Sequence, residues 1–166
     1  MFTAMLESIT TLLQPWADFH AEHTGLATAI VAAHLLGLFV GGGIAIGADR
    51  RVLLAQPGSN EAYVAAGADL AATHGVVLVA LTVTVLSGLA LAAADAGTFG
   101  TSPVFWSKMI VFGLLLVNGM QMRRTERRIM GDGEPALPWN RLRRSARLSI
   151  GGWLLLVVLG VVLANT

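Results

Sequence analysis

The run Gly25–Gly47, "GLATAIVAAHLLGLFVGGGIAIG", decides the fold class of this sequence. It contains no Asp, Glu, Lys or Arg, and about 20 apolar residues in a helix are enough to cross the hydrocarbon core of a bilayer. Because the bilayer core offers no water to backbone polar groups, such a segment must be helical. Three further runs have a similar character, and they are Leu70–Ala94, Val104–Met122 and Leu148–Ala164.

The composition of the whole chain agrees with this interpretation. Its 166 residues are 55% hydrophobic and only 13% charged, a balance that excludes an ordinary soluble domain. The mean hydropathy is +0.69. We therefore predict one membrane domain over residues 1–166, built as an all-α bundle of four transmembrane helices.

The basic residues predict how the bundle is oriented. Ten of the eleven are arginines, and they lie in two loops: Arg50 and Arg51 in the first, and Arg123, Arg124, Arg127, Arg128, Arg141, Arg143, Arg144 and Arg147 in the third. The N-terminus, the 95–103 loop and the C-terminus have no Lys or Arg. By the positive-inside rule, the arginine loops face the cytoplasm and both termini lie outside. Because topology explains the arginines, we expect the lipid bilayer as a partner and no nucleic acid.

The first residues predict a short amphipathic helix on the outer membrane surface. Apolar residues follow helical spacing there, namely Phe2, Met5, Leu6, Ile9, Leu12, Leu13 and Trp16. We expect this helix to end at Pro15 and to lie in the interface or to cover the flank of a partner subunit. The chain has no cysteine, which excludes disulfides and thiolate chemistry.

Histidine in the first apolar run is the strongest functional signal. On a helical projection His23 and His34 lie within about 20° of each other, and His20 lies within about 60° of both. Gly37 and Gly41 continue the same stripe, so another helix or a flat macrocycle can approach it closely.

An imidazole within the bilayer needs a partner, and neutral imidazole is a good iron ligand. His34 is therefore a candidate axial ligand of haem, or else a structural histidine bonded to a neighbouring helix. The second axial ligand stays open between Met109 and a residue of another subunit.

The other histidines suggest weaker sites. His20 and His23 form an H-x-x-H pair on the outer side, next to Asp18 and Glu22, which suits Cu²⁺ or Zn²⁺. The alternative is a solvated segment before the membrane. On a straight helical register, His74 lies on the order of 15 Å from His34 along the membrane normal, too far to share one iron. We expect it near the interface, and a second site or a different register are the alternatives.

Lys108, the one lysine, lies about one turn inside the third apolar run. An ammonium at this depth must pair or snorkel to the interface. Asp95 is one candidate partner, and a carboxylate of a bound ligand, such as a haem propionate, is another. Nearby Trp106 adds a polar atom, whereas we expect Thr84 and Ser87 to bond carbonyls of their own helix.

Three stretches together resemble a known group of membrane proteins: "HLLGLFVGGGIAIGADRR", "LTVTVLSGLAL" and "FWSK". Over roughly residues 27–124 the chain is similar to the small bacterial proteins around the HemJ-type protoporphyrinogen oxidases and to the copper-resistance D (CopD-like) domain. The resemblance implies an inner-membrane protein associated with haem b, with His34, Arg50, Trp106 and Lys108 as the matching positions. For CopD-like proteins it implies copper handling, with His20 and His23 as the extra ligands.

The sequence thus predicts a small inner-membrane protein that binds b-type haem and takes part in redox or haem metabolism, in the manner of a b-type cytochrome. Two alternatives stay open: a copper-handling protein, or a non-catalytic accessory subunit of a larger membrane complex or homo-oligomer. Whether the protein is an enzyme stays open as well.

Overall fold

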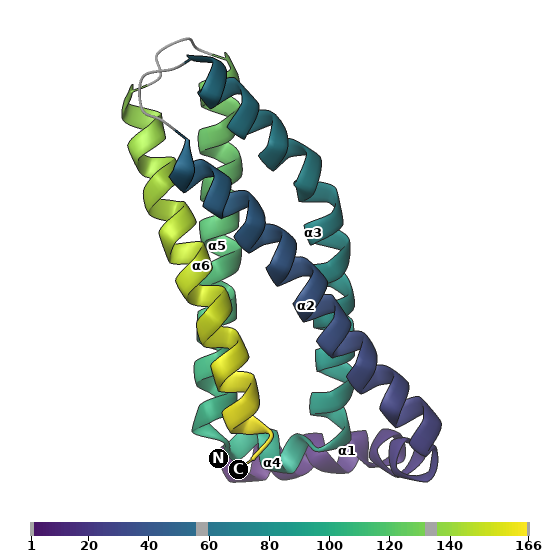
Figure 1. The fold of residues 1–166 in the computed structure, drawn as a ribbon. Coiled ribbons are helices and arrows are strands. Elements are labelled where there is room, and N and C mark those ends of the chain that lie inside the picture. The colour runs from purple at the N-terminus through teal and green to yellow at the C-terminus, as the bar shows by residue number, and fades with distance from the viewer. Residues whose placement is uncertain (1, 56–59, 132–135, 166) are drawn as a thin grey trace.

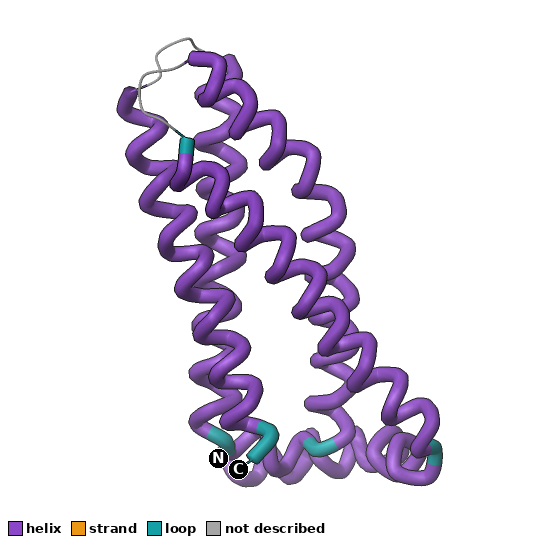
Figure 2. Tube along the Cα trace, viewed as in Figure 1, coloured by secondary structure: helices purple, strands orange, loops and turns teal. Residues whose placement is uncertain are grey.

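Every regular element of the part of the chain that the structure describes is a helix. The computed structural model describes residues 2–55, 60–131 and 136–165. The helices are α1 (Phe2–Glu22), α2 (Thr24–Leu54), α3 (Asn60–Ala94), α4 (Ala96–Thr101), α5 (Pro103–Gly131) and α6 (Ala136–Leu163) (Figures 1 and 2).

Four of these helices are long and apolar enough to cross a membrane: Thr24–Leu54, Gly67–Ala94, Pro103–Arg128 and Trp139–Leu163. They contain the four apolar runs, except that the last run extends one residue past the end of α6. The prediction of an all-α fold with four helices long and apolar enough to span a membrane is confirmed, which is consistent with a multi-pass membrane protein.

The four long helices form two pairs. Helix α2 packs along α3 and α5 packs along α6, while α2 and α6 connect the two pairs. The pairs lie together at the end where α2 and α5 finish and diverge toward the other end (Figure 1). Helix α1 lies across that other end, where both chain termini are also found.

The buried core lies at the end of the bundle where α2 finishes and α6 begins. Its side chains come from α2, α5 and α6, and they are Ala48, Val52, Met122, Trp139, Leu142 and Ala146. Trp153 and Leu156 of α6 are also buried, but many large apolar side chains point outward, as with Phe39 at 79% exposure and Leu114 at 65%. Because lipid tails can cover such side chains, this surface suits a bundle inside a bilayer.

Glycines let α2 approach its neighbours. A Cβ on Gly37 would lie 2.5 Å from Thr84 Oγ1 and 2.9 Å from the carbonyl oxygen of Ala80 on α3. A Cβ on Gly42 would lie 2.9 Å from the Trp153 ring on α6. Small residues at helix contacts are the usual means of close packing in membranes.

Two local predictions about the N-terminal region are wrong. Helix α1 runs through Pro15 to Glu22, with no break at the proline. Proline removes one helical hydrogen bond, and the contact that Trp16 makes just beyond it, from Nε1 to the carbonyl oxygen of Ala90 at 2.9 Å, helps to hold the second half. The chain turns at His23, so His20 and His34 lie on different helices and the continuous histidine stripe does not exist.

The α2–α3 contact makes a direct prediction. Gly37→Ala should lower the free energy of unfolding by about 1–3 kcal/mol, because the new methyl group overlaps the backbone of α3. Gly43→Ala is the matched control, since nothing lies within 4 Å of its Cβ, and it should be neutral or slightly stabilising. Thermal unfolding in detergent micelles, followed by tryptophan fluorescence, measures both; equal stability of the two variants would contradict the packing.

Candidate functional site

His34 faces α3 from the middle of α2. Its Nδ1 lies 3.0 Å from the carbonyl oxygen of Thr84 and 3.2 Å from Ser87 Oγ. Gly88 leaves space for the ring, because a Cβ there would come within 3.0 Å of Cε1. The imidazole is half-buried and is held by the backbone of the neighbouring helix.

These contacts determine where the imidazole carries its proton. A carbonyl oxygen only accepts hydrogen bonds, and the Ser87 hydroxyl lies 2.6 Å from the carbonyl oxygen of Val83, which takes its hydrogen. Therefore Nδ1–H donates to Thr84, and the lone pair of His34 lies on Nε2. No hydrogen bond joins Nε2 to any residue that the structure describes.

Lys108 is the second ionisable residue of the candidate site, and it lies on the other helix pair. It is half-buried on α5, and its Nζ lies next to Gly160 of α6, 3.7 Å from where a Cβ would stand. Its charge acts on the His34 imidazole. Among the described residues no hydrogen bond or ion pair reaches Nζ. Asp95, one predicted partner, caps α4 by accepting from Thr98 N at 3.3 Å.

The glycines of the predicted site have a packing role. The space beside Gly37 is filled by Thr84 and Ala80, and a Cβ on Gly41 would stand 3.1 Å from Ala80 Cβ. The sequence allowed either a helix or a flat macrocycle to pack against these glycines. In the structure, helix α3 packs against them. Any ligand of His34 must lie on the other side of the ring, where Nε2 points.

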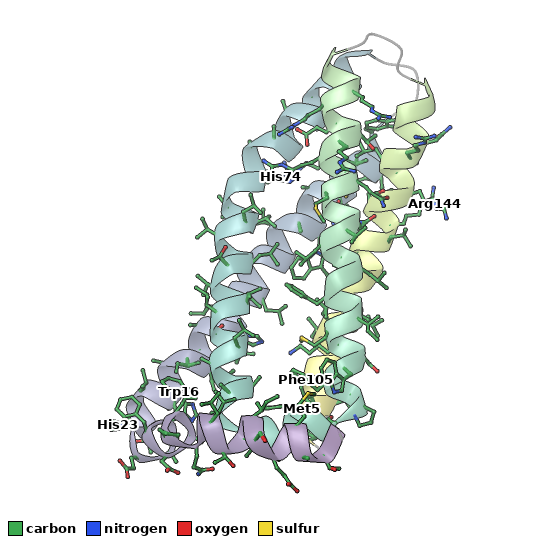
Figure 3. The ribbon with its side chains drawn as sticks, turned by 180° about the vertical axis from the view of Figure 1, so that it is seen from behind. Met5, Trp16, His23, His74, Phe105 and Arg144 are labelled. Atoms are coloured by element: carbon green, nitrogen blue, oxygen red, sulfur yellow. The ribbon has the colours of Figure 1, made fainter. Side chains whose placement is uncertain are left out.

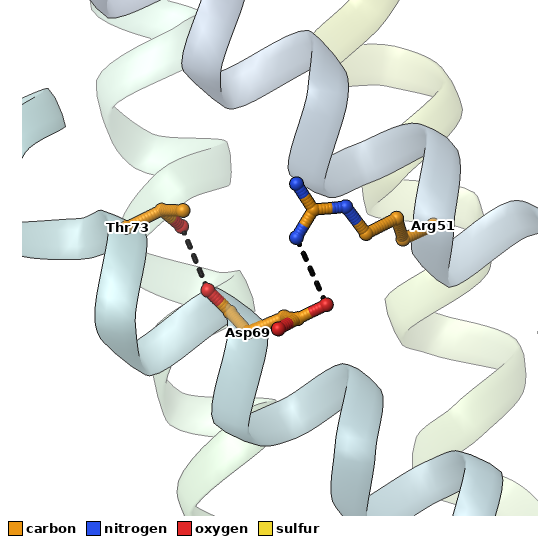
Figure 4. Close-up of polar contacts among 3 residues, drawn as sticks. All are labelled: Arg51, Asp69 and Thr73. Atoms are coloured by element: carbon orange, nitrogen blue, oxygen red, sulfur yellow. Dashed lines mark hydrogen bonds and ion pairs between the residues drawn. The ribbon is translucent and has the colours of Figure 1, made fainter.

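Arg50 lies far from His34 along α2, and Trp106 bonds to its own part of the chain. Arg50 is exposed, 16 residues further along α2, roughly 24 Å away at 1.5 Å per residue. The neighbouring Arg51 instead ties α2 to α3 through Asp69, with 2.9 Å between Nη1 and Oδ2 (Figure 4). Trp106 is 51% exposed and donates from Nε1 to the carbonyl oxygen of Gly100 at 3.0 Å.

The outer histidines stand at the corner between α1 and α2. His23 Nδ1 donates to the carbonyl oxygen of Phe19 at 2.8 Å, and its ring lies beside that of Phe19. His20 Nε2 is buried without a hydrogen-bond partner, close to Trp16, and Figure 3 shows His23 and Trp16 at this corner. Within the described residues, no group of three or more His, Cys, Asp or Glu side chains could hold a metal ion.

His74 lies on α3 toward the opposite end of the bundle, as Figure 3 shows. His74 is 10 residues before Thr84, the residue of α3 that contacts His34. The two histidines are therefore about 15 Å apart along the axis of α3. The predicted bonds of Thr84 and Ser87 to their own helix are confirmed, with acceptors at Ala80 and Val83.

Asp49 is a buried carboxyl group that the sequence analysis missed. Asp49 is 2% exposed, hydrogen bonds to Ser149 of α6, and has a buried Oδ2 without a partner. Its position beside Arg50 and Arg51 indicated a solvated loop. Since α2 continues to Leu54, the carboxyl turns into the α2–α6 contact instead.

Comparison with known proteins adds no relative: no family model matches the sequence, and no curated protein or solved structure is similar to it. The resemblance to the HemJ-type and CopD-like proteins therefore stays a prediction.

The geometry of His34 predicts its tautomer. Nitrogen-15 NMR of histidine-labelled protein in micelles should show His34 protonated at Nδ1, because the Thr84 carbonyl requires a donor. His34→Gln identifies the resonances. Protonation at Nε2 would contradict the assignment and would remove the free lone pair.

Proposed function

We propose that this protein is a small membrane protein that binds b-type haem through His34. The observation that carries the proposal is the hydrogen bond from Nδ1–H to the Thr84 carbonyl, which leaves the Nε2 lone pair free. Histidines that ligate metals usually donate their other ring hydrogen to a carbonyl or carboxylate, which fixes the ring and its tautomer. Neutral imidazole in this state is a ready iron ligand.

The charge of Lys108 suits the carboxylates of haem. Lys108 supplies an ammonium without an anionic partner among the described residues, and it lies close enough to act on His34. A propionate carboxylate would give this ammonium the partner that a charge in the bilayer requires. Met109 follows on α5 with 37% exposure and is one candidate for the second axial ligand.

Haem, when bound, would supply one-electron redox chemistry. The chain's part is to ligate through His34, to orient the ring through Thr84, and to keep the surroundings apolar. A role in redox or haem metabolism follows from that chemistry.

An absorption spectrum tests the proposal. Protein purified after expression with haem supply should show a Soret band, which His34→Ala should abolish. His74→Ala, on the same bundle but far from His34, should keep it, and Lys108→Gln should weaken haem retention by roughly tenfold, the loss of about one charge-assisted bond. Unchanged helical circular dichroism shows that the variants fold.

The other outcomes of this experiment decide between the alternatives. Bound copper that is lost in a His20→Ala/His23→Ala variant, without a Soret band, would indicate copper handling. Neither signal, with larger subunits co-purifying, would indicate an accessory subunit. A Soret band that persists in His34→Ala would refute the ligand assignment.

For localisation we propose the bacterial inner membrane, with both termini and an interfacial α1 outside and the arginine-rich connections in the cytoplasm. All ten arginines belong to one end of the bundle, and α1 and both termini to the other. This is the distribution that the positive-inside rule describes.

Cysteine labelling tests the orientation, because the chain has no cysteine of its own. A membrane-impermeant maleimide should label Ser8→Cys on intact spheroplasts. It should label Ala55→Cys, at the end of α2, only after permeabilisation. The reverse pattern would place the termini in the cytoplasm.

A further inference from the structure

The arginine-bearing ends of α5 and α6 form a positively charged surface that the haem proposal does not use. From Arg123 to Arg147 the sequence has eight arginines against three acidic residues, a net charge of +5. We propose that this surface binds the phosphate groups of anionic phospholipids in the adjoining leaflet.

The first argument is exposure. On α5 the four arginines 123, 124, 127 and 128 are all exposed, and on α6 so are Arg141, Arg144 and Arg147. Figure 3 shows Arg144 pointing away from the bundle. Only Arg143 turns inward, where its Nη2 donates to the carbonyl oxygen of Leu53 at 3.1 Å.

The second argument is that the protein does not neutralise these charges. Glu126 is the one acidic residue on the described parts of α5 and α6. It is 8% exposed and interacts with Arg123 and Arg127, which leaves the other exposed guanidinium groups without an anion on these two helices. Like charges four residues apart destabilise a helix, and α5 has two such pairs, 123 with 127 and 124 with 128. A bound anion would relieve this repulsion.

The third argument is depth in the membrane. The apolar run that ends at Met122 is about 28 Å long as a helix, close to the roughly 30 Å of a hydrocarbon core, so Arg123 begins at its boundary. On α6, Arg147 directly precedes Leu148, which is 58% exposed. Both arginine groups therefore lie at the level of lipid headgroups.

The fourth argument is the chemistry of the side chain. A guanidinium group offers a planar fork of donors that matches phosphate oxygens bidentately, whereas a lysine ammonium binds as a point charge. Arginine at every one of these positions fits phosphate recognition. Each basic group near an anionic surface contributes on the order of 1 kcal/mol to attraction.

The test compares thermal unfolding in nanodiscs of neutral phosphatidylcholine with nanodiscs that also contain phosphatidylglycerol. Phosphatidylglycerol should raise the unfolding midpoint of the wild-type protein by on the order of 3 °C or more, because a ligand of the folded state stabilises it. The rise should shrink by more than half in Arg124→Gln/Arg128→Gln/Arg144→Gln. The corresponding Arg→Lys variant should keep a larger part of it than the Gln variant.

Arg51→Gln is the matched control, because this arginine is already paired with Asp69. It should keep the full rise. If the triple variant does not fold, Arg144→Gln alone should still lose a measurable part of the rise.

Three results would overturn the proposal: an equal rise in the triple Gln variant and the wild-type protein, an equal loss in Arg51→Gln, or the same rise in neutral nanodiscs with inorganic phosphate or an oligonucleotide. None of these measurements involves haem, so the outcome is independent of the function proposed for His34.

Discussion

The close approach of α2 to α3 is the constraint on which the rest of the molecule depends. It requires that Gly37 have no side chain, because the backbone of α3 occupies that space. His34 lies one turn before Gly37 and therefore shares its face. The same approach that excludes a methyl group at Gly37 brings the His34 ring within hydrogen-bond distance of the Thr84 carbonyl. Helix packing thus determines which imidazole nitrogen is free.

The membrane explains how much of the fold the sequence predicts. A bilayer permits few structures, so an apolar run such as Gly25–Gly47 specifies a spanning helix almost by itself. The cost of burying an ionisable group in an apolar run also identified His34 and Lys108 as candidate site residues. The contact of His34 with Ser87 and Thr84 was not predictable, since it depends on how α2 and α3 are rotated about their axes. Gly37 and Gly41 indicated the face of α2 that a neighbour approaches, but no hydrophobic periodicity defines the rotation of α3.

The errors have a common cause at the ends of the spans. Outside the apolar runs, local rules such as the helix-breaking tendency of Pro15 compete with tertiary contacts, here that of Trp16 with Ala90. Likewise Asp49 resembles a loop residue beside Arg50, yet it is buried because α2 continues past the apolar run and packs on α6. Single-sequence patterns do not describe which neighbour a helix end will meet.

The two ends of the bundle differ in how their polar groups are accommodated. At the arginine end a packed core holds the helix pairs together, and the surplus charge faces outward, where water and headgroups can meet it. In the diverging half, Lys108 and His34 lie on different helix pairs and interact electrostatically. Neither Lys108 Nζ nor His34 Nε2 has a hydrogen-bond partner among the described residues. Polar groups within apolar segments that lack partners are costly in free energy, and one ligand could provide partners for both. A single ligand that accepts from an ammonium at one edge and binds an imidazole lone pair at another would satisfy both. This double requirement, more than either residue alone, is why His34 and Lys108 together are the candidate site residues.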